Sequence, residues 1–534
     1  MNRNSIFLIL IIIVVSGLSP ALQVLSVKGF ENQWSTVSPM PTARGSHGVA
    51  VVDGKIYNIG GQNETGILAN TEVYDISTDT WSVKTSMPTA RSSFAIAVYQ
   101  NQIYCIGGVI GEIDNPETTG LTEVYDPNTD SWETKRSMSS ARSDLSANVV
   151  NNAIYLIGGR QYQGLDLNFR EVALNEVYFP DNDSWIEKSP MFISVFGYTS
   201  SVINGKIFII GGSRQFQETE TGISVQFNQM YDPKIDAWRN LAGIPTAKSH
   251  AGSGLTKGVT APVMLYCIGG LDQGGYSDIN YAYDITQNNW TIATPIPTAR
   301  AYLGLVEVND VFYAIGGFDG NKWLGTNELY KPLNYGTVLP KFTVLSPENK
   351  TYASNNVSIT LSVNRPINWI GSSLNNKENV TLTGDTMLSK LSDGEYKLII
   401  YINDTFGNEV GSDTIQFTVD TKPPIISVLS PENNKTYGEL DILSTIVIDE
   451  PVSWIGYSLD GLETVTVTGN VTLAVLSEGD HNIIFYATDI VGNNGSTETI
   501  YFSIAQFPAL ILIMLVLIII IIIMALYLFL KRKQ

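Results

Sequence analysis

The segment Lys55-Ile-Tyr-Asn-Ile-Gly-Gly61 decides the fold, because five further copies of its ending follow along the chain. In each copy an aromatic residue is followed two positions later by Ile-Gly-Gly, and the glycine pairs lie at Gly60–Gly61, Gly107–Gly108, Gly158–Gly159, Gly211–Gly212, Gly269–Gly270 and Gly316–Gly317. Successive pairs are 47, 51, 53, 58 and 47 residues apart. A period of about 40–50 residues is typical of the four-stranded blades of a β-propeller.

Each copy continues with a tyrosine, and in the first five copies a tryptophan follows seven residues after it: Trp81, Trp132, Trp185, Trp238 and Trp290. The sixth copy has Tyr330 but no tryptophan at that spacing, whereas the N-terminal segment contains Trp34. We therefore expect the segment around Trp34 to pair into the sixth blade and close the ring. Closure removes the free strand edges that promote aggregation.

The repeated Gly-Gly, Tyr and Trp positions resemble the kelch repeat. The resemblance covers residues 30–335, about 57% of the chain. It implies an all-β fold that begins with a six-bladed kelch β-propeller.

A second repeat follows, with a period of 84–85 residues. Leu345-Ser-Pro-Glu returns at Leu429, and Trp369-Ile-Gly returns at Trp454. Short alternating runs between Gly, Asn and Asp predict strands. We predict two tandem β-sandwiches, over residues 341–420 and 423–505, which resemble the immunoglobulin-like (Ig-like) modules of microbial surface proteins.

Both ends of the chain are apolar. Residues 1–21 contain Arg3 and then the run Ile6–Val15, which is typical of a secretory signal peptide, although an uncleaved anchor has the same composition. Residues 507–530 carry no charge and are long enough for a transmembrane helix, and residues 531–534 are mostly basic. The positive-inside rule makes 531–534 a cytoplasmic tail. We therefore expect a single-pass type I protein of the cell membrane, with most of the chain extracellular.

The charge distribution fits an exposed surface protein. The net charge is −19, and residues 341–504 contain 20 Asp and Glu against 8 Lys and Arg. An acidic surface disfavours nucleic acid as a partner. Asn-x-Ser/Thr triplets make the protein a candidate glycoprotein, with candidate sites at Asn63, Asn349, Asn356, Asn379, Asn403, Asn434, Asn470 and Asn494. The two cysteines occupy equivalent positions in blades two and five, too far apart for a disulfide.

Most copies of the propeller repeat carry a cation in the segment that precedes the first strand of the blade. These residues are Arg44, Arg91, Arg142, Lys248 and Arg300, with Val195 in the fourth copy. The resemblance to kelch propellers implies that this segment lies on the ligand-binding face, so the cations would surround the mouth of the central channel. Cations in such a ring predict an acidic ligand.

A structural role is the alternative, because four blades also carry a glutamate two residues before the returning tyrosine: Glu72, Glu123, Glu176 and Glu328. These are the four blades that carry the arginine. Arg142 and Arg300 are thus candidates both for ligand contact and for an ion pair within the blade, since an unpaired charge near the core is costly. Lys248 has no matching glutamate, which favours it as a ligand-binding residue.

Further candidates for ligand binding lie on the same face. His250 and Tyr302 stand two residues after the cation positions of blades five and six. The loops after the glycine pairs carry Arg160, Arg214 and Trp323. Arginine and aromatic side chains are typical interface anchors, and loop packing is the alternative. We expect ligand contacts to concentrate on the half formed by blades three to five.

The catalytic inventory is small. The chain has three histidines, of which His250 alone is a plausible residue of the binding face. The residues indicate no metal site, no cofactor and no catalytic residues, which favours binding of an extracellular protein or glycan. An extracellular carbohydrate-active enzyme similar to the sialic-acid mutarotases is the alternative, with His250 as its acid–base group.

Overall fold

The computed structural model describes residues 31–532 except 113–114, 163–168, 216–221, 383–385 and 506–508. The predicted signal peptide, residues 1–21, lies outside the described residues, as do the last two residues of the predicted tail. The chain divides into two compact units near Pro340. They are described separately.

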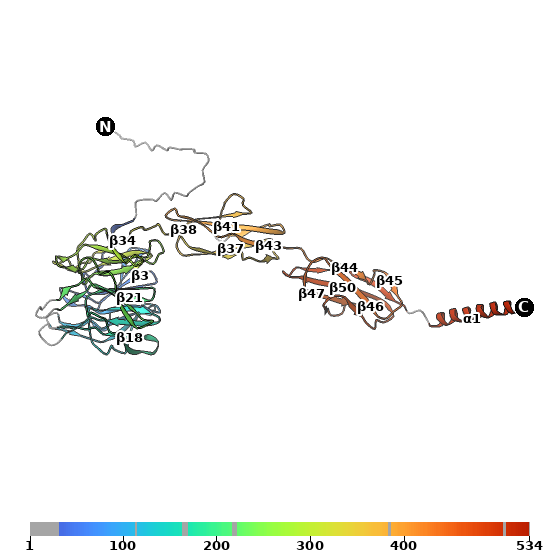
Figure 1. Ribbon diagram of the computed structural model, residues 1–534, viewed down its shortest axis with the longest axis horizontal. Helices are drawn as coiled ribbons and strands as arrows, with labels where there is room; N and C mark the ends of the chain where they lie inside the picture. The colour runs from blue at the N-terminus through green and yellow to red at the C-terminus, as the bar shows by residue number, and fades with distance from the viewer. Residues whose placement is uncertain are drawn as a thin grey trace, which may run out of the picture. The chain divides into compact units, whose positions relative to one another are not determined.

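The first unit contains six four-stranded antiparallel sheets, which confirms the predicted six blades (Figure 1). From the innermost to the outermost strand, blades one to three are β2 (Gly48–Val52), β3 (Lys55–Ile59), β6 (Thr71–Asp75), β7 (Thr80–Lys84); β8 (Ala95–Tyr99), β9 (Gln102–Ile106), β12 (Thr122–Asp126), β13 (Ser131–Lys135); and β14 (Ser146–Val150), β15 (Ala153–Ile157), β18 (Asn175–Phe179), β19 (Ser184–Lys188).

Blades four to six follow the same plan: β20 (Thr199–Ile203), β21 (Lys206–Ile210), β24 (Asn228–Asp232), β25 (Ala237–Asn240); β26 (Gly252–Leu255), β27 (Leu265–Ile268), β30 (Asn280–Asp284), β31 (Asn289–Ala293); and β32 (Gly304–Val308), β33 (Val311–Ile315), β34 (Asn327–Lys331), β1 (Gln33–Val37). The innermost strands contact one another in the order β2, β8, β14, β20, β26, β32 and back to β2. The blades therefore form a closed ring.

The ring closes through the N-terminal strand, as predicted. Strand β1 pairs antiparallel with β34, and this register places Trp34 opposite Tyr330. The two rings stack with centroids 4.8 Å apart. The sixth blade is thus built from both ends of the propeller segment.

The glycine pairs are required where neighbouring blades approach closely. Gly60 and Gly61 have φ angles of 60° and 94°, a region that favours glycine. A Cβ on Gly60 would lie 2.6 Å from the carbonyl oxygen of Arg91 in the next blade, and the Gly61 amide donates a hydrogen bond to that oxygen. The equivalent amide bond recurs at all six blade boundaries.

The repeated tyrosine and tryptophan explain how the outer strands of adjacent blades are joined. In blade one the carboxylate of Asp79 accepts hydrogen bonds from Tyr74 Oη and from the backbone amide of Ser38 in blade six, while Trp81 Nε1 donates to the Ser38 carbonyl. We call these three bonds the inter-blade clasp. The clasp recurs at every boundary, with distances of 2.6–3.1 Å.

The last clasp again uses the N-terminal segment. The side-chain oxygen of Asn32 accepts from Tyr330 Oη at 2.7 Å and from the Thr294 amide at 2.8 Å, and Trp34 donates to the Thr294 carbonyl. The acceptor residue is aspartate in four clasps and asparagine in the other two, and all six have φ between 46° and 55°. Asn and Asp tolerate this left-handed conformation best among non-glycine residues.

In the second unit, residues 341–419 form a sandwich of two sheets with the core between them. One sheet is three-stranded: β35 (Phe342–Ser346), β37 (Val357–Val363) and β40 (Thr386–Leu388). The other is six-stranded: β36 (Thr351–Tyr352), β43 (Ile415–Val419), β41 (Gly394–Asp404), β38 (Ile367–Leu374) and β39 (Val380–Thr381), with β42 (Glu409–Gly411) on β41.

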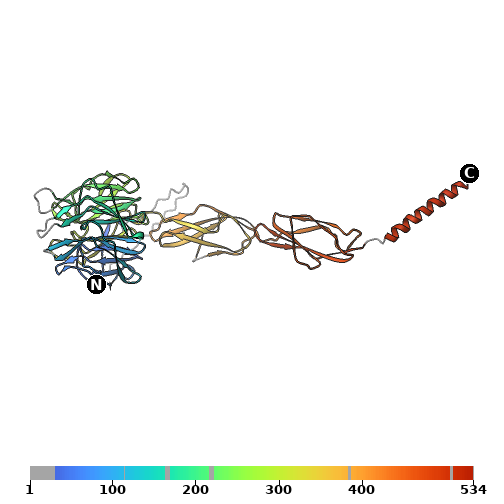
Figure 2. The same cartoon turned by 90° about the horizontal axis from the view of Figure 1, so that it is seen from below.

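Residues 426–504 repeat this arrangement strand by strand, as the sequence period predicts. The three-stranded sheet contains β44 (Ile426–Ser430), β46 (Ile442–Ile448) and β49 (Val471–Leu473), and the six-stranded sheet contains β45 (Lys435–Tyr437), β52 (Ile500–Ile504), β50 (Gly479–Asp489), β47 (Val452–Leu459), β48 (Val465–Val467) and β51 (Asn494–Ser496). The two modules are coloured yellow and orange in Figure 2. Their resemblance to Ig-like modules stays a prediction.

The chain ends in helix α1 (Ala509–Lys531). Among the described residues, one helical segment, Ile513–Lys531, is long enough and apolar enough to cross a membrane. Its side chains are exposed. The segment agrees in position with the predicted transmembrane helix.

We predict that Asn32→Ala destabilises the propeller while Asn32→Asp does not. Alanine removes the acceptor of two hydrogen bonds and is strained at φ 55°, which together cost about 2–4 kcal/mol of unfolding free energy. Aspartate occupies the equivalent position in four clasps. Denaturant unfolding of the full-length protein in detergent, followed by tryptophan fluorescence, measures the difference. Unchanged stability of Asn32→Ala would contradict closure through this clasp.

We further predict that low pH weakens the four aspartate clasps. Hydrogen bonds from the tyrosine hydroxyl and the backbone amide lower the pKa of Asp79, Asp130 and Asp236, and they outweigh burial at Asp183. A lowered folded-state pKa stabilises the fold above the unfolded value of about 3.9, and this contribution is lost as pH falls through the folded pKa. The stability difference between wild type and Asp79→Asn should therefore shrink below about pH 4. A difference that grows on acidification would contradict this assignment.

Candidate functional site

A closed ring of backbone hydrogen bonds surrounds the mouth of the central channel. Six residues, one from each blade, form this axial ring: Ser46, Ser93, Asp144, Gly197, His250 and Tyr302. The amide of each residue donates to the carbonyl of its equivalent in the preceding blade, at 2.6–3.0 Å, and Ser46 completes the circle by donating to Tyr302. The ring therefore fixes where the side chains of its five non-glycine residues start.

All six residues of the axial ring have φ between 51° and 58°. Gly197 must also be glycine for a steric reason, because a Cβ there would lie 2.4 Å from Nε2 of His250. The imidazole of His250 thus occupies the volume that a side chain at Gly197 would fill. The sequence permits a large side chain in blade five because blade four has none.

The arginines that precede the ring are buried ion pairs within their own blades. The pairs Arg44–Glu72, Arg91–Glu123 and Arg300–Glu328 have N–O distances of 3.1, 2.8 and 2.5 Å, and Arg142 contacts Glu176 in the same way. The hydroxyl of the preceding Thr or Ser also donates to each glutamate, as Thr42 does to Glu72. This confirms the intra-blade pairing suggested by the co-occurrence of Arg and Glu.

Blades four and five replace the ion pair by other buried contacts. In blade four Val195 takes the place of arginine, and Gln229 forms two hydrogen bonds with the backbone of Ile193. In blade five Lys248 Nζ donates to the carbonyl of Gly269 at 2.8 Å and to Ser277 Oγ at 2.6 Å. Burial lowers the pKa of Lys248. At the position of the arginine, the segment that precedes the first strand of each blade therefore requires a buried side chain and hydrogen bonds, but not a charge.

These contacts correct the predicted cation ring. Arg142 and Arg300 are fully buried, and Lys248 is 1% exposed. The structure therefore places none of the three where a ligand on the loop face would reach it. The absence of a glutamate partner does not expose Lys248, because a carbonyl and a hydroxyl replace it. The predicted acidic ligand loses the cations on which it was based.

A cavity of about 490 Å³ lies on the loop face over blades three to five, next to the axial ring. We call it the loop-face cavity, and its lining residues are Arg160, Phe169, Phe196, Ser213, Gly222, Ile223, Ser224, Ser249, His250, Leu271, Asp272, Gln273 and Tyr302. Short hairpins that follow the glycine pairs form its sides: β16 (Arg160–Tyr162) with β17 (Phe169–Glu171), β22 (Ser213–Arg214) with β23 (Ile223–Ser224), and β28 (Leu271–Asp272) with β29 (Gly275–Tyr276).

Two hairpins on the other blades lie outside this cavity. They are β4 (Gln62–Asn63) with β5 (Gly66–Ile67) in blade one, and β10 (Val109–Glu112) with β11 (Asn115–Thr118) in blade two. A 3₁₀ turn, η1 (Pro180–Asn182), joins β18 to β19. The lining therefore comes from blades three to five together with Tyr302 of blade six.

Asp144 of the axial ring joins two residues of the cavity. Its carboxylate accepts a hydrogen bond from Arg160 Nε at 2.6 Å and lies 3.6 Å from Nε2 of His250. Burial alone would raise the pKa of Asp144, but the charge of Arg160 and the contact with His250 outweigh it and lower the pKa. Asp144 is thus an ionised carboxylate that holds Arg160 in place.

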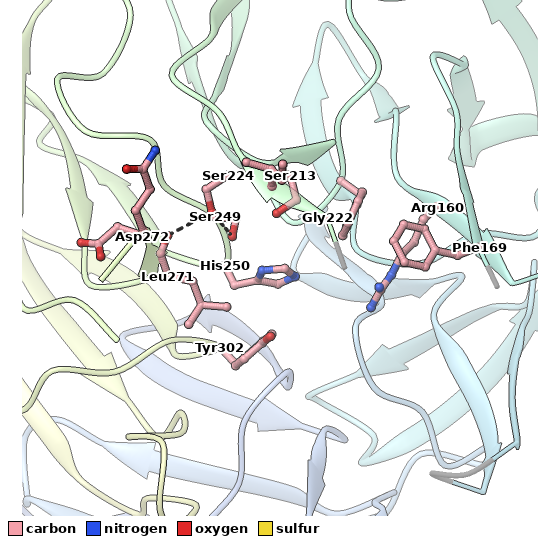
Figure 3. Close-up of a pocket in the computed structure, with 13 residues that line it drawn as sticks. Arg160, Phe169, Ser213, Gly222, Ser224, Ser249, His250, Leu271, Asp272 and Tyr302 are labelled. Carbon is pink, nitrogen blue, oxygen red and sulfur yellow. Dashed lines mark hydrogen bonds between the residues drawn. The ribbon is translucent and has the colours of Figure 1, made fainter. Parts of the chain in front are cut away.

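Aromatic rings pack against the side chains of Arg160 and His250. The Arg160 guanidinium lies 4.8–5.1 Å from the ring centroids of Tyr162, Phe169 and Phe196. The rings of His250 and Tyr302 lie 4.6 Å apart, and burial beside Asp144 raises the pKa of Tyr302 to about 12. Figure 3 shows the Arg160 guanidinium and the His250 ring directed toward one another across the cavity.

Two other predicted residues are held by contacts with neighbouring loops. Arg214 of the blade-four hairpin pairs with Glu171 of the blade-three hairpin at 3.3 Å. Trp323 packs against the ring of Phe318, with centroids 4.8 Å apart, and against Gly45. Trp323 lies on blade six and is not among the residues that line the loop-face cavity.

The candidate glycosylation sites differ in exposure. Asn63 is 7% exposed, its amide donates to the Ala43 carbonyl, and its oxygen accepts from Thr65. This corrects the prediction for Asn63, since its nitrogen is not accessible in the folded propeller. Asn403 is half-buried, and the remaining six are exposed: Asn349, Asn356, Asn379, Asn434, Asn470 and Asn494. Glycosylation of these residues stays a prediction.

Sequence reasoning missed two features of the site, and it also missed the acceptors of the inter-blade clasp. Asp144 was visible as the one acidic residue of the axial ring, but its pairing with Arg160 depends on the hairpin geometry. Phe169 and Phe196 carry no motif that separates a cavity wall from a loop core. The acceptors of the clasp do carry a signal, because Asp or Asn stands five residues after the tyrosine in five copies.

Comparisons with known proteins agree with this architecture. The model of the KLHDC2/KLHL20/DRC7 Kelch-repeats domain matches residues 20–159, and the Kelch motif model matches residues 299–335. These segments carry kelch repeats. The matched regions contain the first blades and the sixth, which the ring brings together.

Relatives share the repeats over part of their length. Kelch-like protein 40 of Xenopus tropicalis is 32% identical over 34% of this chain and 27% of its own length. Kelch-like protein terF of Aspergillus terreus is 29% identical over 38% of this chain and 44% of its own. The chain thus spans about a quarter to under a half of these relatives. A solved structure titled "Structure of YjhT" is 17% identical, covers 55% of this chain and 97% of its own, and has a TM-score of 0.46.

We predict that the buried pair Arg44–Glu72 is structural. Arg44→Val leaves a buried carboxylate without its cation and should cost about 3–5 kcal/mol of unfolding free energy. The double variant Arg44→Val/Glu72→Gln reproduces the solution of blade four and should recover about 2 kcal/mol. Fluorescence-detected urea unfolding compares the two. A double variant that is no more stable than the single one would argue against the pair.

Proposed function

We propose that this protein is a cell-surface recognition protein, anchored by α1, whose propeller binds an extracellular protein or glycan in the loop-face cavity. The observation that carries the proposal is the cavity itself. Its volume lies within the range of ligand sites, about 300–1,000 Å³. Its lining combines aromatic rings with a few polar groups, which is the usual composition of such sites.

The anchor is supported by the helix at the C-terminal end of the described chain. Helix α1 is apolar over Ile513–Leu530 and ends in Lys531, and Arg532 follows. Basic residues directly after an apolar span favour the cytoplasmic side. In this orientation the propeller and both sandwich modules are outside the cell.

A carbohydrate-active enzyme is the second candidate, and His250 is the observation that favours it. Both ring nitrogens of His250 are buried and have no hydrogen-bond partner among the described residues. An imidazole in a cavity beside a carboxylate is a possible acid–base group. Turnover of a sugar substrate that is abolished by His250→Ala would favour this candidate over simple binding.

We predict that external protease releases the propeller from intact cells. The measurement is immunoblotting with antibodies against the propeller, before and after permeabilisation. The released fragment should be found in the medium without permeabilisation. Protection of the propeller until the membrane is opened would contradict the proposed orientation.

Binding through the cavity is tested by Gln273→Arg, which places a large charged side chain at an exposed position of the cavity wall. Gln287→Arg, on the exposed turn before β31, makes the same change outside the cavity. We expect ligand binding by cells that express the protein to fall roughly tenfold or more for Gln273→Arg and to stay unchanged for Gln287→Arg. Equal binding by both variants would contradict a role for the cavity.

A further inference from the structure

The two arginines around the loop-face cavity are already paired with carboxylates. Arg160 pairs with Asp144 at 2.6 Å and Arg214 pairs with Glu171 at 3.3 Å. On the other wall, Asp272 forms no ion pair with a described residue. A ligand carboxylate would therefore meet an arginine that is already paired with Asp144, and the carboxylate of Asp272. The net charge of −19 adds repulsion at longer range.

The aromatic surface of the cavity comes from two half-buried rings, Phe169 on one side and Tyr302 beside His250. Phe196, whose ring centroid lies 4.9 Å from that of Phe169, is 3% exposed and supports Phe169 from behind. The negative face of an aromatic ring attracts the weakly positive C–H groups of a ligand. Among the lining residues, Ile223 is the large aliphatic side chain with high exposure, at 44%.

Several polar groups of the lining have unused hydrogen-bonding capacity. The terminal nitrogens of Arg160 and the hydroxyl of Tyr302 form no hydrogen bond with a described residue. The ring nitrogens of His250 are buried, and Nε2 lies 3.6 Å from the Asp144 carboxylate, so they do not belong to this set. Gln273 is exposed, and Asp272 uses one oxygen for the amide of Gly274. The set therefore offers donors, acceptors and groups that do both. A sugar hydroxyl, which donates and accepts, matches such a mixed set.

We propose that the loop-face cavity binds an uncharged sugar unit of a glycan, with its C–H face against Phe169 and its hydroxyls bonded to Arg160, Tyr302 and the polar wall. This inference rests on the proposed binding function and names the ligand class of the same cavity. A protein partner is disfavoured, because interface anchors are usually aromatic side chains presented at the centre of a broad patch. Here the rings form the inner walls of a concave site.

The test uses the full-length protein in detergent and calorimetric titration with paired oligosaccharides. One member of each pair consists of neutral hexose or N-acetylhexosamine units, and the other carries a uronic or sialic acid. We expect binding of at least one neutral oligosaccharide and weaker binding of its acidic counterpart. Affinity should not change between about 0.1 M and about 1 M salt, although the Debye length falls from about 10 Å to about 3 Å.

A matched pair of variants locates the binding site. Tyr302→Phe removes one hydroxyl from the cavity and should weaken sugar binding about 2- to 12-fold, the effect of one hydrogen bond. Tyr501→Phe removes an exposed hydroxyl from β52 of the second sandwich module, away from the cavity, and should leave the affinity unchanged. Unchanged affinity of Tyr302→Phe would overturn the assignment of the sugar to this cavity.

Two other outcomes separate this inference from the proposed function. If an acidic glycan or a protein binds in a salt-sensitive manner and Tyr302→Phe weakens it, the recognition function stands and the neutral-sugar inference is wrong. If no neutral oligosaccharide binds, the inference is also wrong. If ligands bind only to the sandwich modules, the proposed function of the propeller fails as well.

Discussion

The structure depends on one constraint. Six blades must meet around an axis while the backbone amides and carbonyls of the axial ring stay hydrogen-bonded to one another. The axial ring satisfies it, because each of its amides donates to the preceding blade and the sixth blade connects to the first. Left-handed φ angles at all six positions are the local cost of this geometry. Glycine pairs, buried arginines and clasps surround the ring and hold each blade at the required distance from its neighbours.

The same constraint leaves the side chains of the axial ring free to differ. Blades one and two contribute Ser46 and Ser93, whereas blades three, five and six contribute Asp144, His250 and Tyr302. Because the backbone ring is closed, these three larger side chains are held on one side of the channel mouth, where the longer loops of blades three and four carry Arg160, Phe169 and Ser213. A symmetric scaffold thus produces an asymmetric site.

Much of the fold could be predicted because its elements recur as repeats in the sequence. Six Ile-Gly-Gly endings and the displaced Trp34 predicted six blades and their closure, and the co-occurrence of Arg with Glu predicted the buried pairs. The site was harder to predict, because burial is set by packing across blades. Lys248 lacks a glutamate but is satisfied by Gly269 and Ser277, and Arg160 gains its partner from a neighbouring strand. Residues that differ from the repeat occur once, so no periodic pattern in the sequence predicts their contacts.

Native-state hydrogen exchange of the six axial-ring amides tests the central claim most directly. If the backbone ring is closed, the amides of Ser46, Ser93, Asp144, Gly197, His250 and Tyr302 should be protected to a similar degree and lose protection together when the propeller opens. The amide of Ser46 is decisive, since it joins the first blade to the sixth. Rapid exchange at Ser46, with the other five protected, would contradict the account.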